Sequence, residues 1–417
     1  MSEFIIDGPV VLQGTVRVGG SKNAAMAILP ACLLATKPVT LHNIPDISDV
    51  RVMLDILRVF GMKIEGASGT VRLDPSELAP AEVPDELATR LRASITMLGP
   101  ILARFGEVKM VHPGGDIIGK RPIDVHLNGL AAMGASVERS NSRYDLTGKL
   151  HGVTIFQEEA SVTGTESTVM AATLAAGRTE IRNAASELHV ADLVKFLRTL
   201  GAKIEGEGTN RLTVEGVSTL AGGEYTIRCD EIEAGTLMIA AGVTGGEVTL
   251  TGVDPQNFAM IPIKLREAGL NFETTEDTVT VKPPHQFRPV DLKTNLWPSF
   301  PSDLQAPFTL LCTQAAGTSL VHDWMYEERF GYVGELRKMG ASIETPDPHR
   351  ALVTGPTELT GQKIKSPDLR AGITMLVAGL IADGQTVIEH ADWIDRGYAD
   401  IEGRLRKLGA QIQRVGG

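Results

Sequence analysis

One glycine-rich segment combines the residue types that a catalytic loop needs. Residues 113–121 read PGGDIIGKR, so that three glycines surround Asp116 and a Lys120-Arg121 pair follows. Glycine lets the backbone adopt positive φ and approach a ligand closely, while a carboxylate beside two cations can handle a proton or a polyanion. A Gly-Gly-Asp turn with a solvated Lys-Arg pair is also common on protein surfaces. The loop alone leaves both interpretations open.

Cations recur at the predicted N-termini of apolar, small-residue helices. Lys22, Arg92 and Arg370 each stand just before such a helix. Free amides and the dipole make this end positive, so a cation there is unfavourable unless an anion lies opposite. N-capping explains the neighbouring Ser and Asp side chains, but it does not explain these three. We therefore expect a shared cleft for a phosphate-bearing substrate. Lys120, Arg121 and Arg396 would complete the cationic set.

A nine-residue signature, Leu-Arg-x-x-Gly-x-x-Ile-Glu or a close variant, recurs six times and must position these cations. Each copy predicts a helix that ends at a glycine C-cap and runs into a short strand. A small-residue apolar helix precedes each copy. One such unit cannot bury its apolar face alone, so six copies predict two domains of three units each. The signature glycines are Gly61, Gly134, Gly201, Gly269, Gly340 and Gly409.

Composition sets wider bounds. The chain has 417 residues, 43% of them hydrophobic, which suits two globular domains. The formal net charge of −11 argues against general nucleic-acid binding. The sequence predicts neither a transmembrane helix nor a secretory signal. Cys32, Cys229 and Cys312 are widely spaced and fit a reducing cytoplasm. The nine histidines show no metal-ligand spacing.

Over its whole length, the chain resembles the UDP-N-acetylglucosamine branch of the enolpyruvyl transferase family. The sister branch, which makes enolpyruvylshikimate phosphate, has different motifs at the helix entrances. The motifs that carry the resemblance are GSKNAA (20–25), NIPDISDV (43–50), RAS (92–94), FPSDLQA (300–306), ERF (328–330), DLRA (368–371) and IDRGY (394–398).

The resemblance implies two inverse α/β domains, each of three βαβαββ units. Residues 22–229 would form the first domain and carry a mobile loop at 113–124, and residues 1–21 with 230–417 would form the second. The implied reaction moves the enolpyruvyl group of phosphoenolpyruvate to the 3′-hydroxyl of UDP-N-acetylglucosamine and releases phosphate. This is the first committed step of peptidoglycan precursor synthesis, in the cytoplasm. The resemblance implies no metal or organic cofactor, no nucleic acid and no membrane insertion.

The same resemblance assigns roles to individual residues. Lys22, Arg121 and Arg396 would hold the phosphate of phosphoenolpyruvate and its developing charge. Asp303 would be the base for the attacking hydroxyl, and Asp116 the proton donor to the methylene carbon. Four residues would be catalytic: Lys22, Asp116, Asp303 and Arg396. The substrate-binding set would be Lys22, Asn23, Arg92, Arg121, Pro122, Ile123, Asp124, Val125, Ser161, Val162, Thr163, Asp303, Met325, Arg370 and Arg396.

Three departures from the family pattern leave alternatives open. Most members have a cysteine at the position of Asp116, although some have an aspartate. The antibiotic fosfomycin alkylates that cysteine, so the departure implies resistance. Glu159-Ala160 and Glu231 depart at the nucleotide site and near the domain hinge. An enolpyruvyl transferase for another acceptor is therefore one alternative. A catalytically silent paralogue that binds a UDP-sugar is the other, disfavoured by the full cationic set and Asp303.

Overall fold

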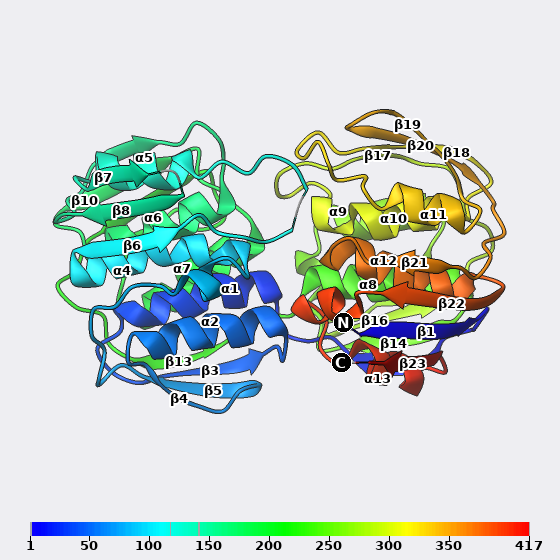
Figure 1. Ribbon diagram of the computed structural model, residues 1–417, viewed down its shortest axis with the longest axis horizontal. Coiled ribbons are helices and arrows are strands. Elements are labelled where there is room, and N and C mark those ends of the chain that lie inside the picture. Colours follow the sequence, from blue (N-terminus) through cyan, green and yellow to red (C-terminus); the bar gives the residue numbers. More distant parts are fainter. Residues whose placement is uncertain (1, 117, 141, 417) are drawn as a thin grey trace. The chain divides into compact units, whose positions relative to one another are not determined.

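The computed structural model describes residues 2–116, 118–140 and 142–416, and these form two compact units (Figure 1). Unit N comprises residues 20–116 and 121–228. Unit C comprises the described residues of 1–19, 117–120 and 229–417. The sequence predicts divisions at 21/22 and 229/230, with the whole loop 113–124 in the first domain. In the structure, loop residues 118–120 group with unit C.

Unit N contains the helices and strands from α1 to β13. Its short 3-10 segments are η1 (Cys32–Leu34) and η2 (Arg92–Met97). Its helices are α1 (Lys22–Ala31), α2 (Ser48–Val59), α3 (Asp85–Ala88), α4 (Leu98–Phe105), α5 (Asp124–Ala132), α6 (Val162–Thr173) and α7 (Leu188–Thr199). Its strands are β3 (Val39–Ile44), β4 (Lys63–Glu65), β5 (Gly69–Asp74), β6 (Glu107–Val111), β7 (Ser136–Ser140), β8 (Arg143–Thr147), β9 (Thr154–Phe156), β10 (Arg178–Arg182), β11 (Lys203–Glu205), β12 (Arg211–Glu215) and β13 (Gly223–Thr226).

Unit C repeats this plan and includes both ends of the chain. Its helices are α8 (Glu231–Val243), α9 (Met260–Glu267), α10 (Gln305–Cys312), α11 (Val333–Lys338), α12 (Leu369–Ile381) and α13 (Ile401–Lys407), with η3 (Pro255–Asn257), η4 (Ser302–Leu304) and η5 (Ala391–Arg396). Its strands are β1 (Glu3–Gly8), β2 (Gln13–Arg17), β14 (Glu247–Thr251), β15 (Asn271–Thr274), β16 (Thr278–Lys282), β17 (Asp291–Lys293), β18 (Gly317–His322), β19 (Ser342–Asp347), β20 (Arg350–Gly355), β21 (Lys363–Lys365), β22 (Gly384–Glu389) and β23 (Gln411–Val415).

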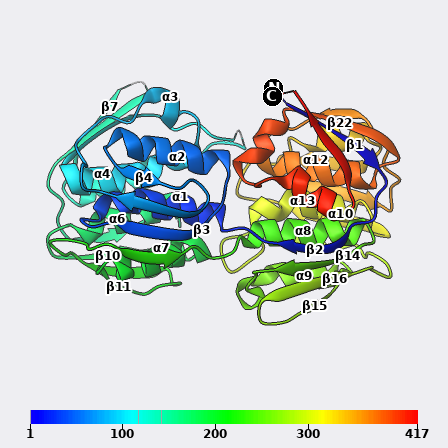
Figure 2. The same cartoon turned by 90° about the horizontal axis from the view of Figure 1, so that it is seen from below.

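The expected βαβαββ unit is confirmed, most plainly in the run β9-α6-β10-α7-β11-β12. Its sheet has the order β11-β12-β10-β9, in which β9 and β10 are parallel and the other pairs antiparallel. Four further sheets follow this order, and the sheet β6-β8-β7 contains three described strands. Each unit holds three sheets. The chain's first strands belong to unit C, where β1 lies between β22 and β23 (Figure 1) and β2 lies beside β14 (Figure 2).

Each repeat has one buried helix and one outer helix. Almost every residue of α8 and α12 is buried, and these helices lie inside unit C with sheets outside them (Figure 1). Their small residues let three helices pack closely around one core. The outer helices, such as α2 and α7, bury one face and expose the other. Among the described residues, no helix is long and apolar enough to cross a membrane.

The repeated signature has a clear structural cause. All six signature glycines have φ between +86° and +104°, the left-handed C-cap conformation that glycine adopts without strain. The signature arginine ties its helix to the next strand. In three repeats its Nε donates to a carbonyl oxygen six residues later, at 2.7–2.9 Å: Arg198 to Ile204, Arg337 to Ile343 and Arg406 to Ile412.

Two of these glycines in unit C provide a matched test. A Cβ on Gly409 would lie 3.6 Å from its nearest neighbour, Val11 O, whereas a Cβ on Gly269 would lie 2.4 Å from Gln286 O. Gly409→Ala should lower the free energy of unfolding by about 1–2 kcal/mol, since only backbone conformation is strained. Gly269→Ala should cost about 2–4 kcal/mol, because a clash is added. Equal losses in urea denaturation would contradict this account.

Candidate active site

Lys22 is a buried cation at the first position of α1. Ser21 caps the helix by accepting the Ala24 N–H, and Lys22 is 8% exposed. Its Nζ lies 2.8 Å from Oδ2 of Asp49, which is 5% exposed in the first turn of α2. The dipole of α1 disfavours an ammonium group there, while the dipole of α2 favours the carboxylate. The sequence predicts a ligand anion opposite Lys22. In the structure, the Asp49 carboxylate provides a negative charge at this position.

Arg92 holds the far end of the predicted catalytic loop. It begins η2, and its Nη2 donates to the backbone oxygens of Arg121 and, at 3.4 Å, Pro122. The near end of the loop touches the same arginine. Gly115 has φ +110°, and a Cβ there would lie 2.7 Å from the Cβ of Arg92. Arg92 thus fixes the path of the backbone on both sides of the loop.

Asp116 is half-buried and belongs to unit N, as does Arg121. Residue 117, within the predicted loop 113–124, lies outside the described residues. The chain passes from unit N to unit C after Asp116 and returns before Arg121. The expected proton donor and the expected phosphate-binding arginine therefore flank a short segment that packs in unit C.

Residues 118–120, which we call the loop tip, contact the side chain of Glu327 and the backbone of Glu328. The Glu328 N–H donates to Ile118 O at 3.1 Å, and the Lys120 N–H donates to Oε1 of Glu327 at 3.0 Å. The Lys120 N–H bond is the main cause that lowers the pKa of the Glu327 carboxyl group. Gly119 has φ +125°, and a Cβ there would lie 2.4 Å from Glu327 Oε2. Only glycine permits this contact.

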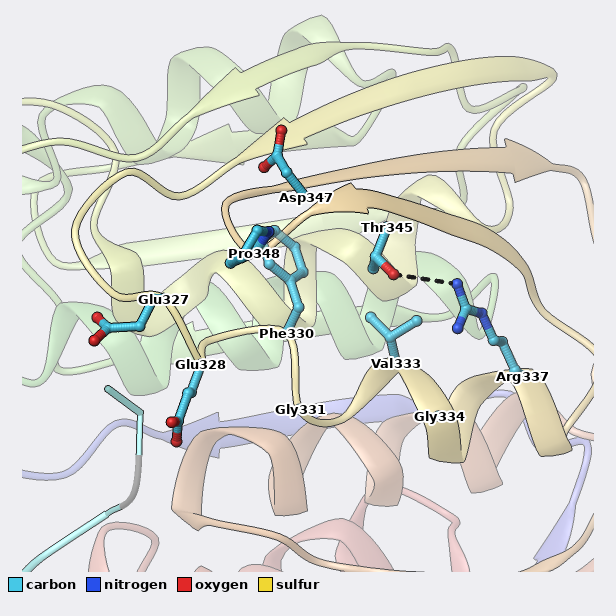
Figure 3. A pocket seen from close by; sticks show the side chains of 10 residues that line it. All are labelled: Glu327, Glu328, Phe330, Gly331, Val333, Gly334, Arg337, Thr345, Asp347 and Pro348. Atoms are coloured by element: carbon cyan, nitrogen blue, oxygen red, sulfur yellow. Dashed lines mark hydrogen bonds between the residues drawn. The ribbon is translucent and has the colours of Figure 1, made fainter. Parts of the chain in front are cut away.

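Glu327 and Glu328 also line a pocket of about 630 Å³ in unit C. Figure 3 shows the two glutamates on one side and Arg337 on the other, with an Arg337–Thr345 hydrogen bond of 3.5 Å. None of the predicted substrate residues lines this pocket. We therefore treat it as the flank of the loop-docking surface and not as the substrate site.

Most predicted nucleotide-binding residues gather at the N-termini of α5 and α6. The His126 Nε2 lies 2.9 Å from Oγ1 of Thr163. A Cβ on Gly164 would lie 2.7 Å from Cγ1 of Val125, so the two helix ends pack tightly. Burial, assisted by nearby Arg92, lowers the pKa of His126 to about 3. The imidazole is therefore neutral at neutral pH and can only act as a hydrogen-bonding spacer there.

The neighbouring side chains of this group differ in exposure. Ser161 caps α6 by accepting the Gly164 N–H at 3.3 Å. Asp124 forms an exposed ion pair of 2.9 Å with Arg139. Asp124 therefore remains accessible for a polar ligand. Ile123 is buried, Pro122 and Glu159 are exposed, and Val162 is half-buried.

Asp303 lies at the centre of a buried cationic cluster in unit C. Its Oδ2 accepts from Nε and Nη2 of Arg370 at 3.1 and 2.8 Å, and its Oδ1 accepts from Nη2 of Arg329 at 2.9 Å. The Asp303 side chain is 35% exposed, whereas those of the two arginines are 5% and 4% exposed. Burial opposes the charge on Arg370, but Asp303 and Tyr398 outweigh it and raise the guanidinium pKa. The carboxylate is thus the open face of this cluster.

Met325 is tied to this cluster through Asp323. The Met325 N–H donates to Oδ1 of Asp323 at 3.1 Å, and the Ser302 hydroxyl donates to Oδ2 of Asp323 at 2.5 Å. Ser302 precedes Asp303 in η4. The structure therefore brings Met325 and Asp303, both predicted to bind substrate, to the same part of unit C.

Arg396 ends η5, where its guanidinium lies 5.3 Å from the ring centre of Trp393. The neighbouring Asp395 pairs with Arg414, which binds it through both Nη atoms at 2.6 and 2.8 Å. Asp395 is thus engaged with β23, and Arg396 is held instead against an aromatic face.

Sequence reasoning assigned no role to Asp49, Arg329 or Glu327. Asp49 and Arg329 lie within recognised motifs, but their partners are 27 and 26 residues away. No local pattern encodes such pairs. Asn23 is half-buried at the start of α1. Among the described residues, no group of three or more His, Cys, Asp or Glu side chains could hold a metal ion.

Comparisons with known proteins agree over the full length of the chain. A family model described as EPSP synthase (3-phosphoshikimate 1-carboxyvinyltransferase) matches residues 6–405. The UDP-N-acetylglucosamine 1-carboxyvinyltransferase of Actinobacillus pleuropneumoniae serotype 5b is 44% identical, with 99% of this chain and 98% of that one covered. UDP-N-acetylglucosamine 1-carboxyvinyltransferase 2 of Bacillus anthracis is 42% identical, with 99% and 97% covered.

Two solved structures share the fold. The enolpyruvyl transferase NikO from Streptomyces tendae matches with a TM-score of 0.90 and 26% identity, covering 99% of both chains. EPSP synthase from Acinetobacter baumannii matches with a TM-score of 0.78 and 20% identity over the whole of both chains. The second similarity is evidence of fold alone.

The docking of the loop tip leads to a prediction about Glu327. Glu327→Ala removes the acceptor of the Lys120 N–H, so that amide should exchange with solvent roughly two- to tenfold faster. Glu327→Gln keeps an oxygen in place and should exchange nearly as the native protein does. Hydrogen exchange measured by mass spectrometry on peptides that contain residue 120 would check this. Unchanged exchange in Glu327→Ala would contradict the contact.

Proposed function

The chain belongs to the enolpyruvyl transferase family, and we propose that it acts on phosphoenolpyruvate and UDP-N-acetylglucosamine. It transfers the enolpyruvyl group to the 3′-hydroxyl of the sugar nucleotide and releases phosphate. Relatives that carry this activity in their names are 42–44% identical over almost the entire chain. One observation on the site carries the chemistry: a half-exposed carboxylate, Asp303, faces two buried guanidinium groups. The two guanidinium groups can exchange the Asp303 carboxylate for an anionic group of a substrate.

The reaction needs three proton transfers. The acceptor oxygen forms a bond to C2 of phosphoenolpyruvate, while the hydroxyl loses a proton and the methylene carbon gains one. Phosphate then leaves with its bridging oxygen, and a proton lost from the methyl carbon restores the double bond. Asp303 is the proposed base for the hydroxyl, and Asp116 the proposed donor to the methylene carbon. Positioned acids and bases typically contribute about 10²–10⁴-fold to such steps.

Asp303 accepts three N–H bonds from two cations while it is paired. These bonds engage both carboxylate oxygens, and a base needs a free oxygen to accept a proton. The phosphate or carboxylate of phosphoenolpyruvate would compete for Arg329 and Arg370 and so release Asp303 toward the sugar hydroxyl. In this proposal, deprotonation of the acceptor depends on the co-substrate being bound. The enzyme therefore activates the sugar nucleotide only when the group to be transferred is present.

The remaining predicted residues fit the same scheme. Lys22 and Arg396 would bind the phosphate of phosphoenolpyruvate together with Arg121, and Arg92 would keep Arg121 in place through its backbone. Asn23 would contact the sugar. The exposed polar groups at the starts of α5 and α6, Asp124 and Ser161–Thr163, would bind the uridine diphosphate, with Pro122, Ile123 and Val125 as the apolar lining.

We infer that the reaction serves peptidoglycan precursor synthesis and takes place in the cytoplasm. The three cysteines are buried thiols, which supports a reducing compartment. The expected partners are the two small-molecule substrates, without nucleic acid.

A phosphate-release assay tests the proposed function directly. Phosphoenolpyruvate with UDP-N-acetylglucosamine should release phosphate and yield the enolpyruvyl sugar nucleotide. Release with a different acceptor, and not with this one, would support an enzyme of another specificity. Binding of the sugar nucleotide by titration calorimetry without any release would identify a catalytically silent protein.

The pairing of Asp303 leads to an unusual prediction for Asp303→Asn. Turnover should fall by about 10²-fold or more, because the base is lost. The dissociation constant for phosphoenolpyruvate should fall as well, since Arg329 and Arg370 lose their internal counter-ion. Steady-state kinetics and calorimetry would measure the two effects. Asp395→Asn, which breaks a comparable pair with Arg414, should leave phosphoenolpyruvate affinity unchanged. Near-native turnover, or weaker binding, in Asp303→Asn would refute the scheme.

A separate prediction concerns the loop acid. A thiolate opens an epoxide ring readily by forming a carbon–sulfur bond, whereas a carboxylate is a much poorer nucleophile. The native chain should therefore resist fosfomycin, and Asp116→Cys should become sensitive while it remains active. Time-dependent inactivation and adduct mass would be measured for both proteins. A fosfomycin adduct on Asp116 of the native chain would overturn this prediction.

A further inference from the structure

We propose that Tyr398, supported by Thr236, is a positioning residue that fixes the orientation of Arg370 for enolpyruvyl transfer. Tyr398 follows η5 and is 1% exposed. Its hydroxyl oxygen lies 3.2 Å from Nη1 of Arg370 and 3.0 Å from Oγ1 of Thr236. Arg370 and Tyr398 belong to the repeat that contains α12 and α13, and Thr236 belongs to the repeat that contains α8. The Tyr398 hydroxyl therefore joins two repeats of unit C.

The direction of each hydrogen bond follows from a count of protons. The Thr236 hydroxyl lies 2.8 Å from the Ile232 carbonyl oxygen in the preceding turn of α8, and a carbonyl can only accept. A threonine has one hydroxyl proton, so Thr236 must accept from Tyr398. The Tyr398 oxygen then accepts from Arg370, which can only donate. The chain of bonds runs one way, from Arg370 to Tyr398 to Thr236 to Ile232.

This series of hydrogen bonds holds Nη1 of Arg370, whereas Asp303 holds the other two nitrogen atoms of the guanidinium group. Asp303 accepts from Nε and Nη2, while Tyr398 accepts from Nη1. Rotation of the planar guanidinium group about its Cδ–Nε bond would move both Nη atoms, so the Tyr398 hydroxyl also sets the direction of the Nη2 donor. The guanidinium carbon lies 5.7 Å from the centre of the Tyr398 ring, within the range of a cation–π contact.

The surrounding packing shows that the placement of Tyr398 is tightly specified. A Cβ on the preceding residue, Gly397, would lie 2.8 Å from a methyl carbon of Leu369, the first residue of α12. Glycine therefore lets the Tyr398 segment approach the helix start that carries Arg370. Burial is the main cause that raises the pKa of Tyr398. The phenol thus stays protonated and can keep donating to Thr236.

The inference rests on the proposed function for its kinetic consequences only. If the anion of phosphoenolpyruvate displaces Asp303 from Arg370, the hydrogen bonds from Arg370 to Asp303 are lost. Tyr398 is then the contact that keeps the guanidinium aligned. Its loss should impair phosphoenolpyruvate more than the sugar nucleotide.

Tyr398→Phe keeps the ring and removes the hydroxyl, so it isolates this contact. The KM for phosphoenolpyruvate should rise by about tenfold, and the KM for UDP-N-acetylglucosamine should change little. In an Arg370→Lys background, Tyr398→Phe should add almost nothing to the loss in kcat/KM, because the residue to be oriented is gone. A purely structural role predicts fully additive losses and equal effects on both substrates, and either result would overturn the proposal.

A second measurement does not depend on activity. In ¹⁵N-arginine spectra of the native protein, Arg370 should give separate, slowly averaging Nη–H signals, assigned by their disappearance in Arg370→Lys. Tyr398→Phe should make these signals average, and Thr236→Val should do so more weakly. Signals that are unchanged in Tyr398→Phe would refute the positioning role. Absence of phosphate release by the native protein would instead refute the proposed function and leave this readout intact.

Discussion

A positive charge at the start of a helix is the constraint on which this structure depends. Lys22 opens α1, Arg92 opens η2 and Arg370 lies in the first turn of α12. The helix dipole opposes a cation at such a position, and burial opposes the charges of Lys22 and Arg370 as well. Each cation is bound by groups of the protein itself. Lys22 pairs with Asp49, Arg92 donates to two backbone carbonyl groups, and Arg370 pairs with Asp303. Each of these cations thus has a partner within its own unit.

The repeat architecture was predictable because its signals are local. A glycine that ends a helix, the apolar helix before it and the strand after it lie within a few residues of one another. The six signature glycines all adopt the predicted left-handed conformation. The partners of the cations were not predictable in this way. Lys22 and Asp49 are 27 residues apart and Asp303 and Arg370 are 67 apart, and sequence spacing does not encode contacts at such distances.

Positively charged side chains occur at both ends of the helices. The signature arginines lie near helix C-termini, whereas Lys22, Arg92 and Arg370 lie at helix N-termini. Where an arginine lies near the end of an outer helix, as Arg198 and Arg406 do, it binds a carbonyl group of the following strand and stabilises the repeat. That end of a helix favours a cation, so no special partner is needed. Arg370 lies at the opposite end of its helix and requires compensation. Helix polarity therefore separates arginines that stabilise the repeat from an arginine that needs an acidic partner.

The N-terminal strands have a consequence for the order in which the protein forms. Strand β1 pairs with β22 and β23, so residues 3–8 must meet residues 384–389 and 411–415. Unit N needs no residue beyond 228, and it can fold while the rest of the chain is still being synthesised. Unit C has to wait for its last strand. Until then, residues 3–8 lack their partner strands, and an unpaired strand edge can pair with another chain.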